Sequence, residues 1–184
     1  MTIEITLRSA GSGEACAAIL ADLPQWFGQP ESNATYARVA EEGPALVVEI
    51  NDQPAALMIL KDHFDTAVEI YLLGVRPGLH HQGLGRALIA RAEAHAAERG
   101  AAYLTVKTLG PSQDYEPYAR TRAFYRAVGF TALEEFPELW DPENPCLFMV
   151  KAVTALARKK GGPRPAPSLS SVSRLRRGRW SCRP

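Results

Sequence analysis

Apolar residues along this chain fall into two kinds of segment. Short apolar runs with the composition of β-strands occur at residues 3–7, 45–50, 55–60, 67–75, 101–107, 130–134 and 146–150. Longer segments with apolar residues three and four positions apart, typical of helices, occur at residues 14–23, 32–42, 83–99 and 118–128. The order is one strand, two helices, three strands, a helix, a strand, a helix and two strands. Because strands and helices do not alternate strictly, this order predicts one mixed α/β domain.

The run at residues 67–75, AVEIYLLGV, is apolar except for Glu69. Such a run is typical of a central strand that is covered on both faces. Side chains alternate along a strand, so we expect Glu69 to share one face with Tyr71, Leu73 and Val75. The single charge makes Glu69 a candidate for chemistry. The alternative is a carboxylate that points to solvent or pairs with an arginine.

Charge divides the chain of 184 residues into two parts. Residues 1–156 hold 12 Lys and Arg against 20 Asp and Glu, a net charge of −8, and we expect them to form the folded domain. Residues 157–184 hold nine basic residues and no acidic one, and they are rich in Pro, Ser and Gly. This basic tail is predicted to be disordered. An acidic domain favours cationic small molecules over phosphate-rich polymers.

The three cysteines, Cys16, Cys146 and Cys182, form no CxxC pair and are odd in number, which argues against a disulfide scaffold. The first residues lack the pattern of a signal peptide, and no stretch approaches the ~20 apolar residues of a membrane span. These features predict a cytoplasmic protein with no membrane partner. His63 and His95 have no partner at metal-ligand spacing, so no metal site is predicted.

The stretch GLHHQGLGRAL at residues 78–88 joins a predicted strand to a predicted helix. Free backbone N–H groups at a helix N-terminus suit a phosphate or pyrophosphate, and glycine lets the ligand approach the backbone. A Walker loop is weakly supported, because Leu84 and Gly85 stand where Lys and a hydroxyl residue are needed. A dinucleotide fingerprint is also weak, since Leu88 replaces the third glycine.

A third interpretation fits the context better. The segment VRPGLHHQGLGRAL resembles the acetyl-CoA signature of the GNAT superfamily of N-acetyltransferases, with His80 where Arg or Gln is commoner. TRAFYRAVGF, residues 121–130, is similar to the second signature of that family. The resemblance covers residues 3–151 and implies a GNAT-type fold, a central mixed, mostly antiparallel sheet of six to seven strands with about four helices. One departure is Tyr118, where many members carry Asn.

The resemblance implies acetyl-CoA as co-substrate and assigns residues to it. The cofactor-binding candidates are Leu73, Val75, His80, His81, Gln82, Gly83, Gly85 and Arg86. Backbone groups of Leu73 and Val75 would contact the pantetheine, with Gly74 permitting a bulge that separates this strand from the next. The remaining candidates would hold the pyrophosphate.

Two residues are candidates for catalysis. Tyr125 occupies the tyrosine position of the family and could donate a proton to the departing thiolate; the alternative is a core tyrosine. Glu69 matches the catalytic glutamate of histone-acetylating members, and beside a dry cleft its pKa could be raised so that it accepts the proton of the amine.

The implied function is N-acetylation of a primary amine on a small molecule, an amino acid derivative or a peptide. One alternative is a non-catalytic module that senses acyl-CoA. Another is binding of nucleic acid or an acidic partner through the tail, which we consider less favoured than a tail with no function. Trp26, Phe27 and Trp140 could line an acceptor pocket, although large aromatics are more often core. The acceptor and the oligomeric state are not readable, though homodimers are common in such families.

Overall fold

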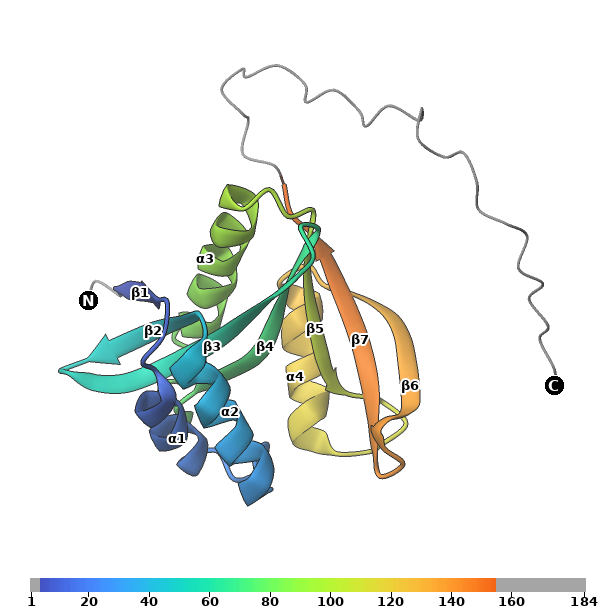
Figure 1. Cartoon of the computed structure of the whole chain (residues 1–184). Helices are drawn as coiled ribbons and strands as arrows, with labels where there is room; N and C mark the ends of the chain where they lie inside the picture. Colours follow the sequence, from blue (N-terminus) through green and yellow to red (C-terminus); the bar gives the residue numbers. More distant parts are fainter. Residues whose placement is uncertain (1–3, 155–184) are drawn as a thin grey trace, which may run out of the picture.

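The computed structural model describes residues 4–154, which form one seven-stranded sheet with four α-helices (Figure 1). The first residue of the predicted strand at 3–7 and the basic tail at 157–184 lie outside the described residues. The elements in chain order are β1 (Ile5–Arg8), α1 (Gly13–Ala21), α2 (Pro30–Glu42), β2 (Ala45–Ile50), β3 (Gln53–His63), β4 (Ala67–Val75), the 3₁₀ turn η1 (Pro77–Leu79), α3 (Leu84–Glu98), β5 (Tyr103–Leu109), α4 (Glu116–Ala127), β6 (Thr131–Asp141) and β7 (Asn144–Ala152). The predicted order of strands and helices is confirmed.

The sheet has the order β1-β2-β3-β4-β5-β7-β6, and its neighbouring strands are antiparallel except for β4 and β5. The parallel pair is short, since residues 67–70 of β4 pair with residues 103–106 of β5. Beyond this segment the two strands diverge, while β4 keeps its pairing with β3 as far as Val75 (Figure 1). Residues 71–75 therefore present one backbone edge that β5 does not use.

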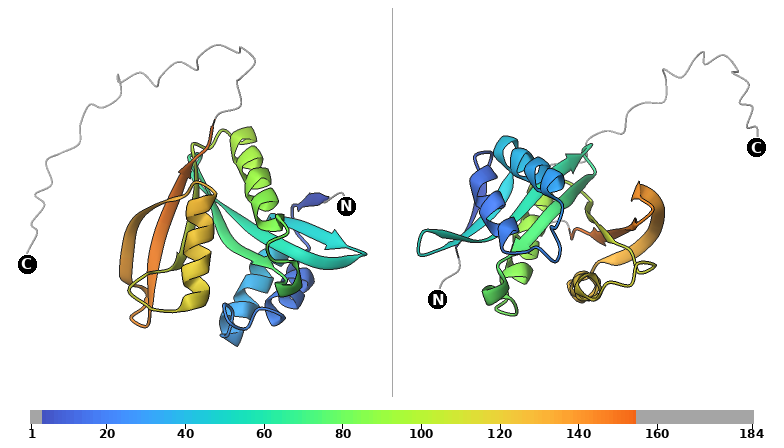
Figure 2. Two further views of the ribbon diagram at one scale, coloured as in Figure 1. Left: turned by 180° about the vertical axis from the view of Figure 1, so that it is seen from behind. Right: turned by 90° about the horizontal axis from the view of Figure 1, so that it is seen from below.

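The helices cover both faces of the sheet, as the views from behind and from below show (Figure 2). On one face, α1 and α2 pack through Cys16, Ile19, Leu20 and Ala40 against the inner strands. On the other face, α3 and α4 enclose a second core around Leu88. Because both faces of β4 are covered, its sequence is almost wholly apolar.

A β-bulge at Tyr71 alters which side chains of β4 share a face. Ile59 of β3 pairs with Leu72 and Leu60 with Ile70, which leaves Tyr71 without a partner in β3. The prediction that Glu69 shares a face with Leu73 and Val75 is therefore wrong, because the extra residue reverses the alternation. Tyr71 and Leu72 both contact the core under α1 and α2, whereas Leu73 and Val75 contact the opposite core.

The bulge was predicted at Gly74, and that position is also wrong. Gly74 is instead required by helix packing, because a Cβ there would lie 3.0 Å from Cγ2 of Ile19 in α1. The divergence of β4 from β5 was expected, but it begins three residues earlier, after Ile70.

The largest error in the predicted elements concerns the length of the strand predicted at residues 130–134. The edge strand β6 spans residues 131–141 and returns through a tight turn into β7. Pro137 is tolerated there because an edge strand has one side free of ladder hydrogen bonds. None of the helices within residues 4–154 is long and apolar enough to cross a membrane.

Candidate active site

A run of unpaired amides follows β4. The backbone N–H groups of residues 81–86 donate to no other group within the part of the chain that the structure describes, whereas those of Leu79 and His80 close the turn η1. The left-handed φ angles of His81 (63°) and Gly83 (87°) tilt successive amides toward one side. A run of this kind at the start of a helix is a concave anion site, and the helix dipole adds positive potential.

The two glycines that flank Leu84 meet different structural constraints. Gly83 is the N-cap of α3, and its φ of 87° is a conformation that a side chain disfavours. Gly85 packs closely against α4, and a Cβ at this position would lie 3.0 Å from Cζ of Phe124. The loop is thus shaped by one backbone requirement and one packing requirement.

The other predicted cofactor residues lie around this turn. Nε2 of His80 lies 2.7 Å from the carbonyl oxygen of Val75, so the histidine ring occupies an acceptor on the free edge of β4. The Gln82 amide donates to the carbonyl of Gly78, and the guanidinium of Arg86 lies 3.5 Å from the carbonyl of Ala127. His81, Gln82 and Arg86 are exposed and free to reorient toward an anion.

Tyr125 lies in α4 between two other aromatic rings. Its side chain is 5% exposed and packs edge-on against Phe124 and Phe130. Burial, and to a smaller degree Tyr118, raises the pKa of the Tyr125 phenol well above its ordinary value, so the hydroxyl keeps its proton at neutral pH. Among the described residues this hydroxyl has no hydrogen-bond partner, which leaves it able to donate to a ligand.

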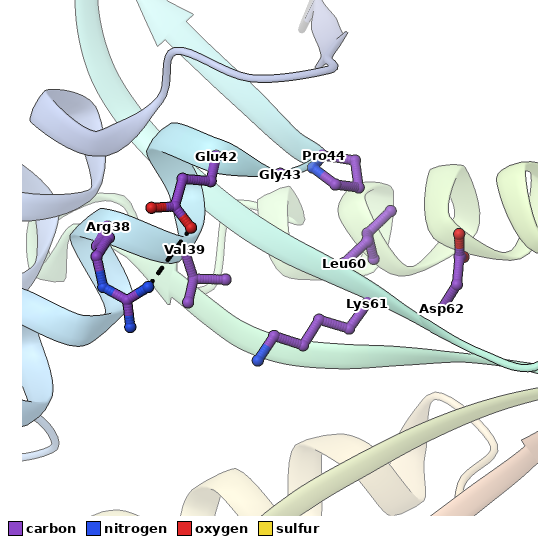
Figure 3. A pocket seen from close by; sticks show the side chains of 8 residues that line it. All are labelled: Arg38, Val39, Glu42, Gly43, Pro44, Leu60, Lys61 and Asp62. Carbon is purple, nitrogen blue, oxygen red and sulfur yellow. Dashed lines mark hydrogen bonds and ion pairs between the residues drawn. The ribbon is translucent and has the colours of Figure 1, made fainter.

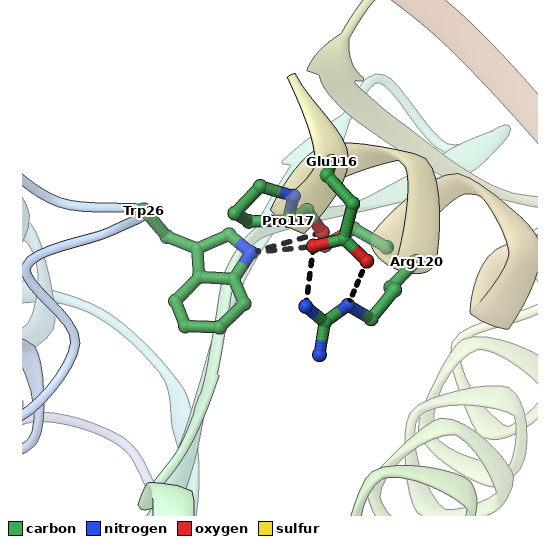
Figure 4. Close-up of polar contacts among 5 residues, drawn as sticks. Trp26, Glu116, Pro117 and Arg120 are labelled. Atoms are coloured by element: carbon green, nitrogen blue, oxygen red, sulfur yellow. Dashed lines mark hydrogen bonds and ion pairs between the residues drawn. The ribbon is translucent and has the colours of Figure 1, made fainter.

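Tyr118, which stands where the resemblance led us to expect Asn, forms a contact with a distant segment. Its phenol donates a 3.0 Å hydrogen bond to the carbonyl of Trp26 in the segment between α1 and α2, and burial raises its pKa to about 12. In return, the Trp26 indole donates to Oγ1 of Thr121 at 3.2 Å and to the carbonyl of Pro117 at 3.4 Å (Figure 4). The Trp26 ring also meets His80 edge-on. Trp26 therefore links the loop after β4 to the first turns of α4.

Glu69 is the centre of a buried charged cluster. Its side chain is 5% exposed, Oε1 accepts a 2.6 Å hydrogen bond from Nζ of Lys107, and Oε2 lies 2.5 Å from Nε2 of His63. Burial raises the pKa of Glu69, but the hydrogen bonds and charges of Lys107 and His63 outweigh it and hold the pKa below its ordinary value. The expectation of a raised pKa is wrong, because the carboxylate has two cationic or donor partners.

A cavity of about 360 Å³ opens beside this cluster. We call it the Lys107 cavity; its lining residues are His63, Ala67, Thr105, Lys107, Phe136, Leu139 and Phe148. Ala67 and Thr105 belong to the segment in which β4 and β5 pair, and Lys107 is the first residue of β5 beyond it, so the cavity lies over the paired strands and reaches the point where they diverge. Its walls are mostly apolar, and its polar groups are those of the charged cluster and Thr105.

A second hollow, of about 460 Å³, lies between α2 and β3 (Figure 3). Arg38 and Glu42 pair one turn apart on the α2 side of it, and Lys61 and Asp62 lie on the β3 side. No predicted site residue lines this hollow or contacts the pair, whereas Glu69 bonds to two residues that line the Lys107 cavity, His63 and Lys107.

Lys107 was not predicted as a site residue, and His63 was discussed only as a possible metal ligand. A signal for Lys107 was available, since it is a basic residue at the end of an apolar strand next to the strand of Glu69. The role of Trp26 in bridging two distant segments had no signal in the sequence, because its partners lie about 90 residues away.

The anion-binding turn, the divided pair of parallel strands and the buried, protonated tyrosine of α4 are compatible with a nucleotide-bound acyl donor. The Acetyltransferase (GNAT) family model matches residues 14–130 of the sequence. The chain therefore belongs to the GNAT family and is an acetyl-CoA-dependent acyltransferase. No curated protein sequence matches it.

Solved structures of similar fold include three that match over their whole length. A GNAT acetyltransferase from Desulfovibrio desulfuricans has a TM-score of 0.73 and 19% identity, covering 83% of this chain and all of that one. The ribosomal-protein-S18-alanine N-acetyltransferase of Escherichia coli has a TM-score of 0.63 and 20% identity, covering 86% and 100%. An aminoglycoside 6'-N-acetyltransferase complexed with coenzyme A has a TM-score of 0.64 and 17% identity, covering 90% and 100%.

Proposed function

We propose that this protein transfers the acetyl group of acetyl-CoA to a primary amine of a small molecule or peptide. The observation that carries the proposal is the run of free amides at residues 81–86, placed at the end of β4 where β4 and β5 no longer pair. These amides suit a pyrophosphate. The free edge of residues 71–75 leads from this turn back to Tyr71, so a thioester laid along it ends beside the charged cluster.

Within this arrangement, Tyr125 donates a hydrogen bond to the departing sulfur. The phenol is protonated at neutral pH and lacks a partner among the described residues, which fits this role. Leu73 and Val75 offer backbone groups to the pantetheine, and His80 gives up the Val75 carbonyl when that arm binds. His81, Gln82, Gly83, Gly85 and Arg86 hold the phosphates.

The acceptor enters through the Lys107 cavity. Phe136, Leu139 and Phe148 make its walls apolar, which favours an amine attached to an apolar group over a polyhydroxylated one. The fold does not choose the acceptor, since structures with this fold include enzymes for a ribosomal protein and for an aminoglycoside. Glu69 supplies negative charge beside the amine as its proton is removed.

Calorimetric titration with acetyl-CoA, followed by thiol release with a panel of amines, tests the proposal. We expect micromolar binding and turnover with phenethylamine or benzylamine exceeding that with kanamycin or alanine amide. Binding without thiol release from any amine would favour a sensor of acyl-CoA. Absence of binding would overturn the proposal.

A further inference from the structure

His63 and Glu69 form a dyad at the wall of the Lys107 cavity. Nε2 of His63 and Oε2 of Glu69 are 2.5 Å apart, and the side chain of His63 is 48% exposed while that of Glu69 is 5% exposed. An ionised carboxylate can only accept hydrogen bonds, so Nε2 of His63 carries the proton. A neutral imidazole in this tautomer keeps its lone pair on Nδ1, which accepts no hydrogen bond from any described residue.

Lys107 affects whether the Glu69 carboxylate or the His63 imidazole can accept a proton from the acceptor. Its ammonium donates to Oε1 of Glu69 and His63 donates to Oε2, so both oxygens of a carboxylate that is only 5% exposed already accept a hydrogen bond. The charged groups of this cluster are Glu69 from β4 and Lys107 from β5, while Lys61, on the same strand as His63, lies with its ammonium over the ring of Tyr71. Of the two partners of Glu69, the His63 side chain is the more exposed, at 48% against 32% for Lys107.

We propose that His63 is the catalytic base that deprotonates the acceptor amine, with Glu69 as a positioning residue that fixes its tautomer and Lys107 as the partner that holds Glu69 in place. This inference rests on the proposed function. The same logic, a carboxylate that orients an imidazole and stabilises its charged form, operates in other acyl-transfer sites.

The protons balance as follows. An alkylammonium acceptor loses one proton to Nδ1 of His63, and its nitrogen then forms a bond to the carbonyl carbon of the thioester. The carbon–sulfur bond breaks, the coenzyme A thiolate takes up a second proton with Tyr125 as the hydrogen-bond donor, and the amide nitrogen keeps the third. His63 returns its proton to solvent, so each turnover releases one proton.

The test compares full-length wild-type protein with His63→Gln, which keeps a donor toward Glu69 but cannot accept a proton, and with His95→Gln as the matched control. We expect His63→Gln to lower kcat about 100-fold with the fastest amine of the panel while KM for acetyl-CoA changes less than about twofold. The ascending limb of the wild-type pH profile should disappear. His95→Gln, on α3 outside the site, should match wild type.

A second acceptor separates chemistry from structural damage. The β-fluorinated analogue of the same amine has a lower pKa and loses its proton more readily. With this amine, kcat of His63→Gln should therefore be lower than that of the wild type by only about fivefold or less. An equal fall in kcat with both amines, or full activity of His63→Gln, would overturn the role of His63. Either result would leave the proposed function standing. No thiol release by wild type with any amine would overturn both.

A measurement on the wild type holds even if the variants fold poorly. Nitrogen-15 spectra should show neutral His63 with its proton on Nε2, and Glu69→Gln should lower kcat and populate the other tautomer. A proton on Nδ1 in the wild type would contradict the proposal.

Discussion

The indole Nε1 of Trp26 lies 3.2 Å from Oγ1 of Thr121, which joins the segment after α1 to α4 across 95 residues of sequence. Because the Trp26 ring also contacts His80, this one side chain touches the turn after β4 and the helix that carries Tyr125. The Trp26 side chain thus connects the turn after β4 directly to α4.

Replacing Trp26 with Phe removes the indole donor and keeps an aromatic ring. Two weak hydrogen bonds are lost, so we expect the free energy of unfolding to fall by about 1 kcal/mol in urea denaturation. Amides of residues 22–29 should exchange faster with solvent. Trp140→Phe is the control, because Trp140 is 48% exposed and makes no hydrogen bond within the described residues. Equal effects of the two substitutions would contradict the bridging role.

Two glycine-to-alanine substitutions in the turn after β4 test the anion site. Gly83→Ala forces a side chain into a φ of 87°, which costs about 1–2 kcal/mol and tilts the amides. We expect its Kd for acetyl-CoA, measured by calorimetry, to rise at least tenfold. Gly78→Ala is the matched control in the same loop, since a Cβ there meets nothing within 4 Å, and its Kd should change less than about twofold. Indistinguishable binding by the two variants would argue against the amide site.

Tyr125→Phe removes only a hydroxyl that has no partner among the described residues. We therefore expect a change in stability below about 1 kcal/mol together with a fall in kcat of about 10- to 100-fold, because the departing sulfur loses its donor. Steady-state kinetics and thermal unfolding measure the two effects. Tyr103→Phe, at an exposed tyrosine of β5, should be silent in both. Unchanged kcat of Tyr125→Phe at every pH would leave Tyr125 as a core residue.

Glu69 links the stability of the protein to acid pH. Its pKa is lower in the folded protein than the ordinary value of 4.5, so its stabilising contribution is present above pH 4.5 and is lost as the pH falls through the folded pKa. Urea denaturation from pH 7 to pH 3.5 should show a steeper loss in the wild type than in Glu69→Gln. The control is Glu49→Gln, at a half-exposed partner of Arg8. The opposite order of slopes would mean that Glu69 is protonated in the native state.

The sequence predicted the order of strands and helices and the glycine-rich turn between β4 and α3 because both depend on local patterns. Glycine at a left-handed φ and apolar runs are visible residue by residue. The face shared by Glu69 and Leu73 was mispredicted, since a bulge at Tyr71 depends on how β3 pairs with β4. The partners of Glu69 were also hidden, because Lys107 comes from a strand 38 residues away. Edge strand β6 was predicted only as far as residue 134, because Pro137 interrupts its pattern.

The most direct test of the central claim is a crystal structure of this protein grown with coenzyme A. The account predicts pyrophosphate oxygens within about 2.7–3.2 Å of backbone nitrogens of residues 81–86, with the pantetheine along the free edge of residues 71–75 and its sulfur near the hydroxyl of Tyr125. Coenzyme A bound elsewhere on the domain, with those amides facing only water, would contradict it.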